Sequence, residues 1–154
     1  MADIRINISK DVENLVRKLS GHDDSDGLFD TLAEALAFAA AYGFQKGFKK
    51  DIEDSAQDPI SQQVFRNKGL DPLINLIAVV EEADPLVLES TNEKEQERIS
   101  IFEKYAYGGL LLLKDELEGS PNDVETVLRL IIDEYNQQNT EGTGLSIEEQ
   151  IKNI

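Results

Sequence analysis

The chain has 154 residues, of which 40% are hydrophobic and 30% charged, and its formal net charge is -16. This length and composition are typical of one folded domain and not of a disordered chain. Cysteine is absent, which excludes disulfides and thiolate metal sites, and a single histidine makes a histidine-based nucleophile or metal centre hard to build. We therefore predict a protein that is not an enzyme, with no catalytic residue, metal or cofactor.

The acidic charge is concentrated in the last two thirds of the chain. Residues 1–50 contain seven Lys and Arg against eight Asp and Glu, whereas residues 51–154 contain eight against 23. Such acidity disfavours non-specific binding to nucleic acid or to an anionic membrane, and favours a basic partner. Because no apolar run is long enough for a membrane span and the first residues lack a signal-peptide pattern, we expect a cytoplasmic protein that does not bind membranes.

The first predicted elements are a strand and a short helix. Ile4, Ile6 and Ile8 alternate with polar residues, which is the two-residue period of a half-buried strand. A helix follows near residues 9–19, with Ser9 as its N-cap. A lone strand leaves backbone groups unpaired, and no other segment alternates cleanly. We therefore expect the strand to pair with its counterpart in a homodimer, or else to use an irregular local partner or form an extended arm.

The next predicted helix has an apolar face made of small side chains. Thr31 and Glu34 form a capping box, so this helix is expected to begin near residue 32 and to end at Gly43 or Gly47. Alanine and glycine recur along one face at helical spacing. A stripe of this kind allows a second helix to approach closely.

Proline and capping residues predict most of the remaining helices. Four dipeptides join a capping side chain to a proline: Asp58-Pro59, Asp71-Pro72, Asp84-Pro85 and Ser120-Pro121. The helices are expected near residues 59–67, 72–83, 93–118 and 121–138. The segment 93–118 is either one long helix or a broken pair, because Gly108 and Gly109 each cost about 1 kcal/mol of helix propensity relative to alanine.

These elements predict a mainly α fold: a single helical domain of five to seven helices with one short N-terminal β-strand. The helical domain is expected to cover residues 1–138 and to begin with a strand-helix-helix unit. Residues 139–154 are expected to form a flexible linker and a short last helix, capped by Ser146 and Glu149.

The order strand, helix, loop, helix is also that of a ribbon-helix-helix DNA-binding module. In that interpretation Arg5 and Asn7 would read bases, because arginine pairs with guanine and asparagine with adenine. The nucleic-acid-binding candidates are Arg5, Asn7, Lys46, Lys49 and Lys50. The connection between the two helices is long and rich in aspartate, and arginine or asparagine on a strand is equally explained by solvent exposure. DNA binding therefore stays an alternative.

Two stretches carry a resemblance to a known family: "FDTLAEALAFAAAYGFQKG" at residues 29–47 and "RISIFEKYAYGGLLLLKDEL" at residues 98–117. They resemble the small DNA phosphorothioation-associated proteins, the fourth associated family of the Dnd systems, over roughly residues 5–135. The positions that match are Phe29, Ala39, Ala40, Gly43, Phe102, Glu103, Tyr105, Ala106, Gly109 and Leu110. We interpret most of them as a helix-packing motif, made of Phe29, Ala39, Ala40, Gly43, Phe102, Tyr105, Gly108 and Gly109.

The resemblance implies a non-enzymatic accessory protein of a bacterial DNA phosphorothioation-linked modification and restriction defence system, acting through protein–protein interaction. It transfers no catalytic residue, and sulfur insertion needs a cysteine persulfide or a cluster donor that this chain cannot supply. The expected partners are other proteins of that system, with DNA as a further candidate. Two alternatives stay open: a ribbon-helix-helix-like DNA-binding module or transcriptional regulator, and an acidic decoy that mimics DNA.

Overall fold

The computed structural model describes residues 4–21, 27–120 and 123–143. The predicted mainly α fold class is confirmed: helices dominate, and a single two-stranded sheet lies near the N-terminus. The chain divides into two compact units, Met1–Asp115 and Glu116–Ile154. This division falls earlier than the predicted boundary after residue 138. The short helix predicted after Ser146 lies outside the described residues.

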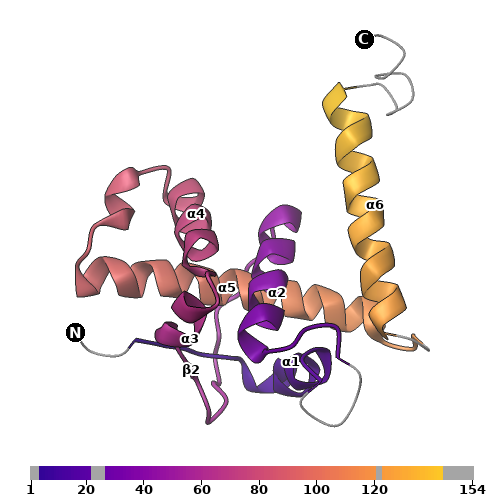
Figure 1. The fold of residues 1–154 in the computed structure, drawn as a ribbon, viewed down its shortest axis with the longest axis horizontal. Helices are drawn as coiled ribbons and strands as arrows, with labels where there is room; N and C mark the ends of the chain where they lie inside the picture. The colour runs from indigo at the N-terminus through magenta and orange to yellow at the C-terminus, as the bar shows by residue number, and fades with distance from the viewer. Residues whose placement is uncertain (1–3, 22–26, 121–122, 144–154) are drawn as a thin grey trace. The chain divides into compact units, whose positions relative to one another are not determined.

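The first unit holds nearly all of the elements, and its longest helix runs through it (Figure 1). In chain order they are β1 (Arg5–Ile6), the 310-helix η1 (Lys10–Val12), α1 (Glu13–Leu19), α2 (Leu32–Lys46), β2 (Ile60–Ser61), α3 (Gln62–Asn67), α4 (Asp71–Glu82), the 310-helix η2 (Pro85–Leu88) and α5 (Asn92–Leu117). Helix α2 contacts α1, α3 and α4. The aromatic centre of the core is an edge-to-face pair of Phe65 and Phe102, whose ring centroids are 5.6 Å apart.

The N-terminal strand finds its partner within the same chain. Strand β1 pairs antiparallel with β2, so that Ile6 faces Ile60, and the amide of Gln62 donates to the carbonyl of Ile4 at 2.8 Å. Ile4, Ile6 and Ile8 are all buried, as their alternation predicted. The segment that carries β2 is irregular and begins at a proline, so it gives no periodic signal of a strand.

The small residues of α2 and α5 form the contact between these two helices. A methyl group added at Gly109 would lie 1.8 Å from the carbonyl oxygen of Ala39, and one added at Gly43 would lie 2.3 Å from that of Tyr105. Since such distances are far below van der Waals contact, only glycine fits at either position. Helix α5 is continuous through Gly108 and Gly109, so the alternative of a broken pair is wrong. We call this contact the α2–α5 seam.

Several predicted helix ends agree with the structure and others do not. Thr31 caps α2 by accepting a hydrogen bond from the amide of Glu34 at 3.2 Å, and Gly47 ends this helix with φ 68°. The predicted start at Pro59 is wrong, because β2 intervenes and Ser61 caps α3 instead. Helix α4 begins at Asp71 itself, without a side-chain cap.

The second unit contains one long described helix, α6 (Asp123–Thr143). The flexible linker predicted for residues 139–144 is therefore wrong as far as residue 143, because the helix continues to that point. The glycine at 142 lowers helix propensity by only about 1 kcal/mol, which a long helix can absorb. Within the described residues, none of the helices combines the length and the apolar character that a membrane span requires.

Candidate functional site

Helix α5 connects several elements of the first unit through polar side chains that are spaced along it. Glu103 accepts a hydrogen bond from the backbone amide of Asn7 at 2.6 Å. The hydroxyl of Tyr107 donates to Asp11 at 2.7 Å, and the hydroxyl of Tyr105 donates to the carboxylate of Glu81 on α4. The polar side chains in the part of α5 that carries the resemblance therefore hold other elements of the first unit in place.

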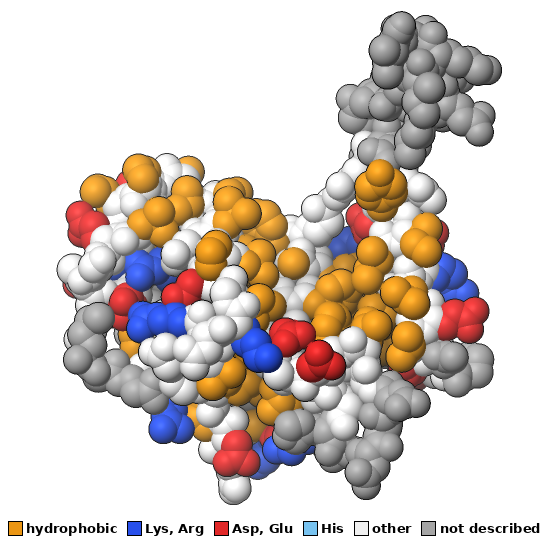
Figure 2. Space-filling model, viewed as in Figure 1, with side chains coloured by type: hydrophobic (Ala, Val, Ile, Leu, Met, Phe, Trp, Pro, Cys, Tyr) orange, Lys and Arg blue, Asp and Glu red, His pale blue; other side chains and the backbone are white. Residues whose placement is uncertain are grey.

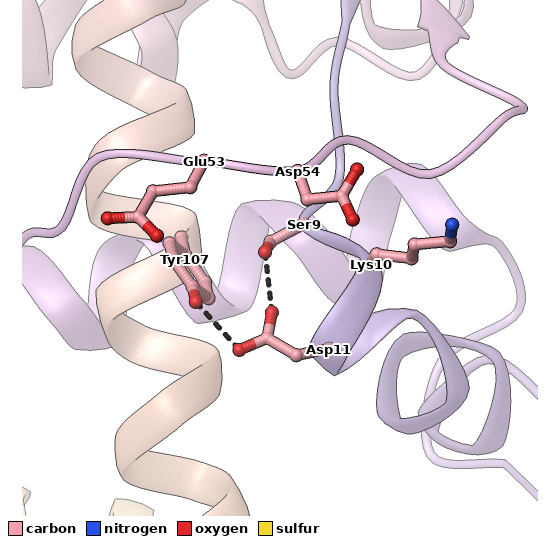
Figure 3. A pocket seen from close by; sticks show the side chains of 6 residues that line it. All are labelled: Ser9, Lys10, Asp11, Glu53, Asp54 and Tyr107. Atoms are coloured by element: carbon pink, nitrogen blue, oxygen red, sulfur yellow. Dashed lines mark hydrogen bonds between the residues drawn. The ribbon is translucent and has the colours of Figure 1, made fainter.

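A surface cavity of about 370 Å³ lies beside Tyr107, between η1 and the segment that follows α2 (Figure 3). It is lined by Ser9, Lys10, Asp11, Glu53, Asp54 and Tyr107. Asp11 accepts hydrogen bonds from the hydroxyls of Ser9, at 2.5 Å, and of Tyr107. Burial raises the pKa of Asp11, but these two hydrogen bonds outweigh it and hold the pKa below its usual value. Each oxygen of the Asp11 carboxylate in this cavity therefore already accepts one hydrogen bond.

A second cavity, of about 390 Å³, is built around Glu103 and Lys104. Its lining is completed by Asn7, Asp51, Ile52, Ser55 and Ser100. Burial raises the pKa of the Glu103 carboxyl, although the hydrogen bond from the Asn7 amide acts in the opposite direction. Lys104 lies 3.5 Å from a carboxylate oxygen of Asp51, which brings this α5 side chain to the segment after α2.

Tyr105 and Glu81 form a hydrogen-bonded pair that is extended by Lys49. Burial and the hydrogen bond donated to Glu81 raise the pKa of Tyr105 to about 12. The hydrogen bond from Lys49, and then the one from Tyr105, lower the pKa of Glu81. Because the three groups favour a neutral tyrosine, a charged lysine and a charged carboxylate, the arrangement is a stable structural contact with no free acid or base.

The residues that sequence reasoning grouped as nucleic-acid-binding candidates lie in different local settings. Lys46, Lys49 and Lys50 lie over the rings of Tyr42, Tyr105 and Tyr107 respectively, each 5.8 to 5.9 Å from the ring centroid. Arg5 is exposed on β1, whereas Asn7 lines the cavity around Glu103. Strand β2 occupies one edge of β1, and directly after β1 the amide of Asn7 donates to Glu103.

The residues of the helix-packing motif do not all lie at the contact between α2 and α5. Ala39, Ala40, Phe102 and Tyr105 are buried. Gly108 faces the segment after α2, where an added methyl group would lie 2.3 Å from the carbonyl oxygen of Phe48. Phe29 lies before α2 and packs against Phe38, with the two rings tilted by 36° and their centroids 5.2 Å apart. Within the described residues, no group of three or more His, Cys, Asp or Glu is placed to hold a metal ion.

Sequence reasoning missed an exposed apolar patch on the first unit. It consists of Leu76 and Val80 on α4 and Leu86 and Leu88 on η2, which are 59%, 53%, 56% and 42% exposed. Figure 2 shows hydrophobic side chains gathered over these two elements. We call it the α4–η2 patch. The sequence carries no signal of it, because Leu86, Val87 and Leu88 are all apolar and nothing in the pattern distinguishes the buried Val87 from its exposed neighbours.

The 310-helix η2 is held rigidly, so the α4–η2 patch is preformed. Asp84 caps η2 by accepting from the amide of Leu86 at 3.0 Å. The buried guanidinium of Arg98 on α5 donates to the carbonyls of Val87 and Glu89, at 2.6 and 3.0 Å. Hydrogen bonds from a charged donor are worth about 1.5–3 kcal/mol, so η2 is firmly anchored to α5.

Comparison with protein families decides the family of the chain. The family model described as DNA sulphur modification system-associated protein 4 matches residues 5–149. The chain belongs to this family. Membership confirms the resemblance carried by α2 and α5, and it associates the protein with a DNA sulphur modification system. No curated protein and no solved structure matches the chain significantly.

The residues that carry the resemblance build the α2–α5 seam and the contacts around it. These positions lie in α2, α5 and the turn before α2, where they pack helices together or bond one element to another. These residues stabilise the fold. The exposed apolar surfaces do not, and a function is needed to explain them.

Proposed function

We propose that this protein is a non-enzymatic accessory of a DNA sulphur modification system and that it acts by binding another protein of that system. The observation that carries this proposal is the preformed α4–η2 patch. Exposed contiguous apolar surface is costly in water and marks sites of protein interaction. The family assignment supplies the setting in which the partner is expected.

Charge around the α4–η2 patch defines the chemistry of the expected partner. The segment 71–98, which carries α4, η2 and the start of α5, contains eight Asp and Glu against two Lys and Arg. A partner that covers the patch therefore presents an apolar centre with a rim of Lys and Arg. Complementary charge of this kind accelerates association and weakens with salt.

The test is a binding titration of the purified chain against each purified protein of the sulphur modification and restriction system. The variants are Leu76→Glu and Leu86→Glu, with Val64→Glu as control, because Val64 is 39% exposed on α3 and lies outside the patch. We expect either patch variant to weaken binding at least tenfold and the control to leave it within about twofold. Binding by none of these proteins overturns the proposal.

Binding to DNA is the alternative function that the same preparation tests. The three candidate lysines lie over tyrosine rings, and the strand that would have to pair between two copies already pairs with β2 of its own chain. We therefore expect no binding to duplex DNA, with or without phosphorothioate linkages, at low salt. Binding that is lost on Arg5→Ala would favour the DNA-binding alternative instead.

A further inference from the structure

Helix α6 presents a second apolar face, in the unit of the chain that does not contain the α4–η2 patch. Leu128, Ile131, Ile132 and Tyr135 are 46%, 41%, 56% and 57% exposed. Their spacing of i, i+3, i+4 and i+7 places them on one side of the helix. Figure 2 shows hydrophobic side chains along this helix. We call these four residues the α6 face.

The α6 face is confined to part of the helix, because other positions of α6 are buried. Val127 is fully buried, and Thr126 is nearly so and shares a short hydrogen bond with Ser120. Both Thr126 and Val127 lie in the first turns of α6. The exposed stripe begins at the next residue, Leu128, so the helix presents its large apolar side chains on one side.

Charge decides which kind of occupant fits the α6 face. Residues 123–138 contain four acidic side chains, Asp123, Glu125, Asp133 and Glu134, and one basic side chain, Arg129. A second copy of α6 would bring the same negative charge against this one. The segment that carries the α4–η2 patch of another copy is acidic as well, with Glu82, Asp84, Glu89 and Glu93 exposed. Self-association through either surface is therefore opposed by like-charge repulsion.

We propose that α6 docks as an amphipathic helix into an apolar groove rimmed by Lys and Arg on a partner protein of the sulphur modification system. An amphipathic helix laid in a groove is recognised through apolar anchors at i, i+3, i+4 and i+7, which is the spacing of the α6 face. The basic rim pairs with the acidic flanks of the helix. The inference rests on the proposed function and adds a second set of contact residues, on α6, to those of the α4–η2 patch.

The decisive comparison is between Ile131→Glu and Val64→Glu in the full-length chain. The two residues are 41% and 39% exposed and the substitutions add the same charge, but only Ile131 belongs to the α6 face. Each variant is titrated against each purified protein of the system at 50 and 500 mM salt. We expect Ile131→Glu to weaken binding of one component at least tenfold and Val64→Glu to leave it unchanged. The affinity of the unmodified chain should fall at least tenfold at the higher salt.

The other possible occupants of the α6 face give different results. A dimer of the unmodified chain in sedimentation velocity that Ile131→Glu dissociates would show that a second copy covers the face, and would overturn the proposal. So would a melting temperature of the free monomer that drops by more than about 5 °C in Ile131→Glu but not in Val64→Glu, because the face would then pack within the chain. Binding that Leu76→Glu weakens and Ile131→Glu does not would overturn this inference alone and leave the proposed function standing. Binding by no component would overturn both.

Discussion

The α2–α5 seam and the α6 face are both helix surfaces with regularly spaced apolar residues, yet they are used in opposite ways. The seam is made of alanine and glycine and brings two backbones so close that no Cβ fits at Gly109. The α6 face is made of leucine, isoleucine and tyrosine and is left exposed. Small residues let helices of one chain approach closely, whereas large ones supply the area that a separate partner needs.

The largest effect is expected from breaking the seam with Gly109→Ala. The added methyl group would overlap the carbonyl group of Ala39, which is backbone and cannot move aside, so the free energy of unfolding should fall by about 3 kcal/mol. Urea unfolding followed by circular dichroism measures it. The control is Gly47→Ala, where there is open space and only the positive φ is strained, at about 1 kcal/mol. Equal losses in the two variants would mean that the seam tolerates a side chain.

A smaller effect should separate the two sides of α6. Val127→Ala removes fully buried methyl groups and should destabilise α6 by about 2 kcal/mol, measured by hydrogen exchange of its amides. Ile131→Ala, on the α6 face, should change the same quantity by less than about 0.5 kcal/mol. Similar destabilisation by both substitutions would place Ile131 in a packed core and remove the contrast with the seam.

The tyrosine beside the seam is expected to titrate late. Because the pKa of Tyr105 is raised to about 12, the folded protein holds this proton after the unfolded chain has released its own, near pH 10. The stabilisation that arises from this difference in pKa is fully present below pH 10 and is lost as the pH rises toward 12. Tyr105→Phe should remove the absorbance change near pH 12 and cost about 1 kcal/mol at pH 7. Tyr135→Phe, on the α6 face, is the control. The hydrogen bond with Ser9 lowers the pKa of Tyr107, but the one to Asp11 and burial outweigh it and raise this pKa as well. The assignment is therefore contradicted by a late transition whose amplitude Tyr105→Phe leaves undiminished.

The smallest effect on stability is expected from Glu103, the partly buried carboxyl that accepts the backbone amide of Asn7. Its raised pKa means that the folded protein keeps a proton that the unfolded chain has already lost. This contribution to stability is therefore present at low pH and is lost as the pH rises from the ordinary value of 4.5 through the raised one. Glu103→Gln should flatten this part of the profile of urea midpoint against pH. Asp133→Asn, exposed on α6, makes the same change in formal charge and should leave the slope as it is.

Local sequence patterns predicted much of the fold and little of the candidate surfaces. The isoleucine alternation, the Thr31 cap and the alanine stripe each depend on neighbours in the chain, so their consequences could be read directly. Three other contacts join residues that are distant in sequence: β1 pairs with the strand at Ile60, Arg98 donates to η2, and Glu103 accepts the amide that follows β1. Such contacts leave no periodic pattern in the sequence. The homodimer expected through β1 stays a prediction, but the unpaired strand that motivated it is paired.

The sequence by itself determined the mainly helical fold, the acidic surface and the small-residue stripes, because these follow from composition and from the period of a helix. Only the tertiary structure decided which apolar residues are covered. Leu36 and Leu76 are both leucines on amphipathic helices, yet the first is buried and the second is exposed. Whether such a leucine is buried depends on whether a segment distant in sequence packs against its helix face, and this contact is decided by the packing of the whole unit.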